Sequence, residues 1–110
     1  MTMTEDQVLL RVRHVTVTRL RGWVDRGWVT PLKGEAGDEY DEIDVARIDL
    51  IRQLRDDLAI EPDTVPVLLS MMDQVYSLRR ELRCVMRAID SQPENVRTVI
   101  VTEIEKIRSS

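Results

Sequence analysis

The chain has 110 residues, of which 20 are acidic and 16 basic, with one cysteine, two Trp, two Tyr and no Phe. This length suits one small domain, or one domain with a projecting helix, and a single cysteine excludes a disulfide framework within the chain. No stretch approaches the roughly 20 apolar residues of a membrane span, and the acidic start resembles no signal peptide, so we expect a cytoplasmic protein that avoids membranes. A small core built of Leu, Ile, Val and Met is marginally stable alone, which favours oligomerisation.

Two short helices are predicted at the N-terminus. Thr4 and Gln7 have the spacing of a capping box, which predicts a first helix from about Glu5 to Val12. After a break that follows His14, apolar residues recur at helical spacing and predict a second helix, which Gly27 ends. The apolar residues of the second helix are Val17, Leu20 and Val24. We expect Trp23 and Trp28 to anchor the core.

A loop or a small hairpin is predicted next, because Pro and Gly cluster between Thr30 and Gly37. Tyr40 then returns the chain to the core, and Asp44 is expected to cap a third helix. One face of that helix is predicted to be buried and consists of Ile48, Ile51, Leu54 and Leu58. The residues expected to face solvent are Arg47, Asp49, Arg52, Arg55 and Asp56.

A long helix is predicted to begin at Asp63, because Pro66 fits only its first turn. Its apolar residues recur with a 3.5-residue period, which is typical of a coiled-coil seam that a second copy of the chain would cover. The seam residues are Leu68, Met71, Val75, Leu78, Leu82, Val85 and Ile89. Cys84 lies within this helix and is expected to be a small buried residue rather than a nucleophile.

The C-terminal segment allows more than one interpretation. Ser91 to Pro93 supply a break, and an apolar stripe from Val96 to Ile107 predicts a further helix that could fold back on the seam as an antiparallel hairpin. The β-branched run from Val99 to Val101 also leaves a strand open. Covering by a second copy and folding back are compatible with each other.

Charge is divided along the first half of the chain. The segment from Arg11 to Lys33 carries six basic residues and one acidic residue, whereas the segment from Gly34 to Asp44 carries six acidic residues and no basic one. Non-specific nucleic-acid binding is typical of a uniformly basic face, and the acidic segment would repel a phosphate backbone. The sequence therefore combines a helix-turn-helix pattern with a charge pattern that argues against DNA.

No pattern in the sequence indicates catalysis. His14 is the only histidine and has no partner at a metal-ligand spacing, and neither a Gly-rich phosphate loop nor a Cys-x-x-Cys pair occurs. The acidic residues between Gly34 and Asp44 lack the regular ligand spacing of a calcium loop. We therefore expect a protein that is not an enzyme and that has no cofactor and no metal.

Two stretches resemble the winged-helix unit of the MerR family. They are R-x-W-V-D-R-G-W-V from Arg21 and Y-D-E-I-D-V-A-R-I-D-L-I-R-Q-L from Tyr40, and the resemblance covers about residues 7–90. It implies a mainly α fold: a MerR-like winged helix-turn-helix over residues 1–62, followed over residues 63–110 by a long coiled-coil-type dimerisation helix and a short C-terminal helix, in a single compact unit.

The resemblance also implies DNA contacts, which are Arg11, Arg13, Arg19, Arg21 and Trp23. The wing arginine of the family, however, falls on Asp38, which would weaken specific DNA binding by a few kcal/mol. The cysteines of metal-sensing members are absent apart from Cys84, and the large added domain of drug-sensing members has no counterpart.

Three further stretches are similar to the chaperone-modulator (CbpM) family: Leu54–Glu61, Val67–Asp73 and Leu78–Ile89. This similarity implies a protein that binds and inhibits the J-domain of a CbpA-type co-chaperone, and the seam predicts that it is a homodimer. Because a J-domain presents a basic helix, acidic residues are the expected contacts. They are Asp38, Glu39, Asp41, Glu42, Asp56, Asp57 and Asp73. The alternatives are a MerR-type DNA-binding transcriptional regulator without a metal sensor, and a dimeric adaptor of unknown partner.

Overall fold

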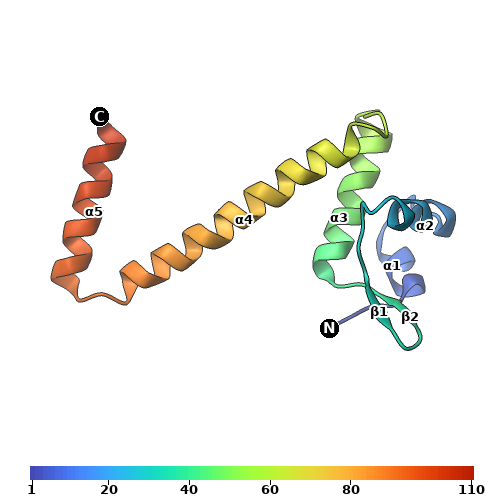
Figure 1. Cartoon of the computed structure of the whole chain (residues 1–110), viewed down its shortest axis with the longest axis horizontal. Helices are drawn as coiled ribbons and strands as arrows, with labels where there is room; N and C mark the ends of the chain where they lie inside the picture. Colours follow the sequence, from blue (N-terminus) through green and yellow to red (C-terminus); the bar gives the residue numbers. More distant parts are fainter. The chain divides into compact units, whose positions relative to one another are not determined.

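The structure is a computed structural model that describes all of residues 1–110. It is mainly helical, as predicted, with the order α1 (Glu5–Arg11), α2 (Val17–Asp25), β1 (Leu32–Gly34), β2 (Gly37–Glu39), α3 (Glu42–Arg52), a π-helical turn η1 (Gln53–Asp57), α4 (Val65–Asp90) and α5 (Glu94–Ser109) (Figure 1). The chain divides into two compact units, Met1–Ser70 and Met71–Ser110, which are described separately.

The two N-terminal helices form as predicted because their caps are encoded locally. Thr4 Oγ1 accepts a hydrogen bond from the Gln7 amide at 3.3 Å, and Gln7 Oε1 accepts one from the Thr4 amide at 2.9 Å. α1 ends one residue earlier than predicted. Thr16 caps α2 through one bond, in which its Oγ1 accepts from the Arg19 amide at 3.2 Å, and Gly27 follows the C-terminal end of the helix with a φ of 77°. Such a left-handed conformation is one that glycine adopts without strain.

The segment between α2 and α3 is a hairpin, here called the wing. β1 and β2 are antiparallel, with Lys33 opposite Asp38. Directly after the wing, Tyr40 exchanges two backbone hydrogen bonds with Met3, at 2.7 and 2.8 Å. This bridge joins the end of the wing to the start of the chain, and the Tyr40 side chain is fully buried, as predicted.

The predicted cap of the third helix is wrong by three residues. Asp41 is the N-cap, and its carboxylate accepts a hydrogen bond from the Asp44 amide at 2.8 Å. Asp44 reciprocates by accepting from the Asp41 amide at 3.0 Å. Both residues take part in one capping box, so the helix begins earlier than the sequence indicated.

The end of the predicted apolar face is also wrong. Leu58 is 64% exposed, whereas Ile48, Ile51 and Leu54 are buried as expected. In η1 the Leu58 amide donates to the Gln53 carbonyl, five residues earlier, at 3.1 Å. This wider turn changes the helical phase, so Leu58 no longer lies on the buried face. Four residues predicted to face solvent are half-buried instead, and they are Arg47, Asp49, Arg52 and Arg55.

One apolar core holds Met1–Ser70 together. Figure 1 shows α1, α2, α3 and the wing close to one another. Trp23 and Trp28 belong to it, as expected. α4 begins at Val65, two residues later than predicted, and contributes Val65 and Leu69. The other members of the core are Val8, Val12, Val15, Leu20, Val29, Tyr40, Ile48 and Ile51. This core fixes α2 and the wing relative to each other.

In Met71–Ser110 the apolar side chains remain uncovered. The seam residues from Met71 to Val85 are 46–65% exposed, while Leu68 and Ile89 are half-buried. The strand considered for residues 99–101 is wrong, because they lie within α5. α5 buries no side chain, so its apolar stripe does not cover the seam in the manner of a packed hairpin. Cys84 is exposed, contrary to expectation.

No helix of the chain combines the length and the apolar character that crossing a membrane requires.

Candidate functional site

The arginines predicted to contact DNA are mostly held by carboxylates of the same chain. Arg21, on α2, makes two hydrogen bonds to Glu5, with Nε at 3.1 Å and Nη2 at 2.9 Å. Arg11, at the end of α1, bonds Glu42 at 2.6 Å. Arg13, by contrast, makes no ion pair. A guanidinium that already has a carboxylate partner has fewer donors left for a phosphate.

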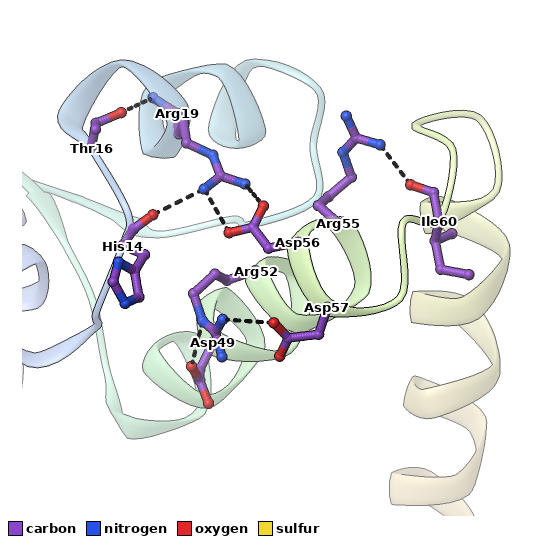
Figure 2. Close-up of polar contacts among 9 residues, drawn as sticks. All are labelled: His14, Thr16, Arg19, Asp49, Arg52, Arg55, Asp56, Asp57 and Ile60. Atoms are coloured by element: carbon purple, nitrogen blue, oxygen red, sulfur yellow. Dashed lines mark hydrogen bonds and ion pairs between the residues drawn. The ribbon is translucent and has the colours of Figure 1, made fainter.

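Arg19 makes the most extensive of these contacts (Figure 2). Its two terminal nitrogens lie 2.8 and 3.0 Å from the Asp56 carboxylate oxygens, and Nη1 also donates to the His14 carbonyl at 2.9 Å. Its guanidinium lies over the Trp23 ring, 5.0 Å from the centroid. The hydrogen bond from Arg19, and secondarily its charge, lower the pKa of Asp56 below the ordinary 3.8. α2 and η1 are thereby joined by a bidentate ion pair.

The rest of η1 is held by two further arginines (Figure 2). Arg52 bridges Asp49, at 3.3 Å, and Asp57, at 3.6 Å. Arg55 donates to the Ile60 carbonyl at 2.6 Å. Asp56 and Asp57, both predicted to contact a protein partner, are therefore engaged within the chain.

The predicted acidic residues of the wing fall into two groups. Asp41 and Glu42 begin α3, where Asp41 caps the helix and Glu42 bonds Arg11, a hydrogen bond that lowers the pKa of Glu42. Asp38 and Glu39 lie on β2, where Asp38 pairs with Lys33 at 2.7 Å and Glu39 makes no ion pair. Asp73 lies on α4, in the other compact unit.

A groove of about 720 Å³ is lined by a different set of acidic residues. The start of α1, the end of α2 and the wing form it, and we call it the acidic groove. Its carboxylates are Glu5, Asp6, Asp25, Asp38 and Glu39. Its two cations, Arg21 and Lys33, are each paired with one of these carboxylates, which leaves a formal charge of −3.

Sequence reasoning missed Glu5, Asp6 and Asp25 as members of this site. Glu5 and Asp6 were recognisable only as acidic residues of a first helical turn. The backbone bridge between Met3 and Tyr40 places that turn beside the wing. Asp25 gave a weak signal, because an acidic residue at the C-terminal end of a helix opposes the helix dipole and so is not explained by helix stability.

Tyr40 also lines the acidic groove. Its hydroxyl is buried and has no hydrogen-bond partner. Burial, followed by the charges of Asp38, Glu5 and Asp44, raises the pKa of Tyr40 to about 12. The phenol therefore keeps its proton at neutral pH and adds a polar group without adding charge.

No group of three or more His, Cys, Asp or Glu side chains is arranged to hold a metal ion.

Comparison with known families gives one result. A family model described as "MerR HTH family regulatory protein" matches residues 9–71, more than half of the chain. The matched range includes α2, the wing, α3 and the beginning of α4. No curated protein and no solved structure matches the chain.

Proposed function

We propose that this chain, which belongs to the MerR family of helix-turn-helix regulatory proteins, is a chaperone modulator: a homodimer that binds and inhibits the J-domain of a CbpA-type co-chaperone. The observation that carries the proposal is the acidic groove, with its formal charge of −3. A basic helix of a J-domain has the complementary charge. Complementary potentials of this kind accelerate encounter and exclude partners of the wrong sign.

The groove changes the expected set of contact residues. Asp38 and Glu39 of the predicted set line the groove, and Glu5, Asp6 and Asp25 line it as well. Among these five, Asp6, Asp25 and Glu39 make no ion pair within the chain, so their charge is available to a partner. We therefore assign the partner contact to the face that α1, α2 and the wing share rather than to the beginning of α3.

The pairing of the arginines supports a protein partner over DNA. A duplex phosphate would have to displace Glu5 from Arg21 or Asp56 from Arg19, which exchanges one charge-assisted bond for another at little gain. It would also approach the acidic wing and meet repulsion. DNA binding by a MerR-type regulator remains the second candidate, because Arg13 and Arg26 make no ion pair with a carboxylate of the chain.

The test measures binding of the purified chain to a CbpA-type J-domain by calorimetry. We expect Asp25→Lys combined with Glu39→Lys to weaken binding at least tenfold, because both carboxylates line the groove and neither makes an ion pair within the chain. The matched control is Glu61→Lys combined with Asp63→Lys, which changes the net charge equally at exposed positions outside the groove. Unchanged affinity in the groove variant at low salt would exclude this surface.

Two further measurements separate the two candidates. We expect the wild-type chain to reduce the ATPase activity that the co-chaperone stimulates in its Hsp70, and the groove variant to do so less. A titration against duplex DNA from the promoter of its own operon is run at several salt concentrations. Nanomolar DNA affinity that falls steeply with salt, without J-domain binding, would replace the modulator function by the regulator function.

A further inference from the structure

A second, smaller pocket lies between α2, the loop that follows it, and the η1 region. Its volume is about 210 Å³, and we call it the Arg–Trp pocket. Its lining residues are Thr18, Arg19, Gly22, Trp23, Arg26, Trp28, Arg55 and Pro62. It shares no lining residue with the acidic groove. Three arginines and no carboxylate line it, in a chain where acidic residues outnumber basic ones.

The arginines of this pocket retain unused hydrogen-bond donors. Arg26 makes no ion pair, and its guanidinium lies over the Trp28 ring at 5.1 Å from the centroid. Arg55 gives one bond to the Ile60 carbonyl. Only Arg19 has a carboxylate partner, Asp56, which does not line the pocket. A guanidinium carries five N–H groups in a planar arrangement that suits an oxyanion, so the pocket is a donor-rich site without an acceptor.

Gly22 gives the second, independent observation. It lies in the interior of α2, where glycine weakens a helix relative to alanine. Its φ is not positive, and a Cβ atom built there would meet no atom within 4 Å apart from the neighbouring backbone of its own helix. Neither the backbone conformation nor packing within the chain therefore requires glycine. The space above Gly22 is open on the wall of the pocket, as it would be if a group from outside the chain filled it.

We propose that the Arg–Trp pocket binds the carboxylate of an acidic side chain that a protein partner presents. The volume is below the roughly 300 Å³ of ordinary small-molecule sites, so it suits a single side chain rather than a free metabolite of that size. A flexible peptide can present one carboxylate to the pocket and keep its other charges away from the acidic wing, whereas a rigid duplex carries a continuous row of phosphates. This inference does not rest on the J-domain proposal.

The chain supplies its own probe for the test, because both of its tryptophans line the pocket. The 110-residue chain is titrated with blocked hexaglutamate while tryptophan fluorescence is recorded. Blocked hexaglutamine is the uncharged comparison, and a duplex DNA and inorganic phosphate are titrated in parallel. We expect a saturable change with hexaglutamate and none with hexaglutamine.

Two variants localise the signal. Arg26→Gln removes the unpaired guanidinium, and we expect it to weaken hexaglutamate binding at least tenfold. Gly22→Leu fills the open space, and we expect it to abolish binding while the melting temperature stays equal to wild type or rises, because leucine favours helices over glycine. The control is Arg108→Gln, which removes the same charge from α5.

Three outcomes would overturn the proposal. They are hexaglutamate titrations that are unchanged in both pocket variants, saturation by duplex DNA but not by hexaglutamate, and the absence of any saturable signal. Because no J-domain is present in these titrations, their failure is distinguishable from failure of the modulator function. Loss of J-domain binding in the groove variant would equally leave this result untouched.

Discussion

The two compact units of this chain differ in how far their apolar side chains are buried. In Met1–Ser70 they converge on one core, and every buried apolar side chain of the structure lies there. In Met71–Ser110 the seam of α4 and the stripe of α5 are regular, yet none of their side chains is buried. The first unit buries a core by folding, although Leu10, Leu32 and Leu58 stay exposed, whereas the second has an apolar pattern that is typical of an interaction surface.

Substitution of one core residue is the strongest test of this contrast. Ile48 is fully buried, so Ile48→Ala should lower the free energy of unfolding by about 2–5 kcal/mol through lost burial and the cavity left behind. Urea titration followed by tryptophan fluorescence measures it, because both tryptophans lie in the first unit. Ile107→Ala, at a position 72% exposed, should change stability by no more than about 0.5 kcal/mol. Equal losses in the two variants would remove the contrast.

A charged substitution tests whether a second copy of the chain covers the seam of α4. If a second copy covers α4, Leu78→Glu places a carboxylate in the dimer interface and should raise the dimer dissociation constant at least tenfold, which is about 1.4 kcal/mol. Light scattering across a range of concentrations measures the mass. Ser77→Glu, one residue away, exposed and off the seam, is the matched control because it changes the net charge equally. A monomeric mass for the wild-type chain at micromolar concentration would refute the dimer.

Tyr40 tests whether a buried polar group of Met1–Ser70 lacks a hydrogen-bond partner. Its buried hydroxyl lacks a partner, so Tyr40→Phe should leave the free energy of unfolding unchanged or raise it by about 1 kcal/mol. Because the folded pKa of Tyr40 is raised to about 12, the contribution of its neutral phenol to the free energy of unfolding is fully present below pH 10 and is lost as pH rises toward about 12. The phenylalanine variant should not show this loss. Tyr76→Phe, on exposed α4, is the control. A loss on Tyr40→Phe would show that the hydroxyl is hydrogen-bonded.

The smallest expected effect concerns the ion pair between α2 and η1. Asp56→Asn should cost less than about 1 kcal/mol at pH 7, because both side chains of the pair are about one-third exposed. The folded pKa of Asp56 lies below 3.8, so its contribution is present above pH 3.8 and disappears as pH falls through the folded value. Urea titrations along that pH range should show the two proteins converging.

Much of the fold could be predicted because its signals are local. The capping box at Thr4 and Gln7, the end of α2 at Gly27 and the 3.5-residue period of α4 each depend on residues a few positions apart. Two signals were ambiguous. Asp41 and Asp44 both suit the start of α3, and β-branched residues in α5 suit a strand as well as a helix. Leu58 could not be placed, because a π-helical turn leaves no mark on a pattern read with a 3.6-residue period.

The candidate sites were less predictable, because they depend on contacts between distant residues. Arg19 and Asp56 are 37 positions apart, and Arg11 and Glu42 are 31 apart. The sequence displayed these charges but not their pairing. Arg11 and Arg19 were expected at DNA, and in the structure each pairs with a carboxylate that was expected at a protein partner. The Arg–Trp pocket was missed for the same reason, because its walls come from α2, the following loop and η1.

The π-helical turn also decides in which direction the side chains of η1 point, and so whether Asp56 can reach Arg19. A turn closed by an i→i+5 hydrogen bond contains one residue more than the α-helical turn it replaces. If the same residues closed a continuous α-helix instead, the residues that follow the turn would be rotated by about 100° relative to α3. The direction of the Asp56 side chain would then change, so the extra residue helps to keep the Asp56 carboxylate beside the Arg19 guanidinium.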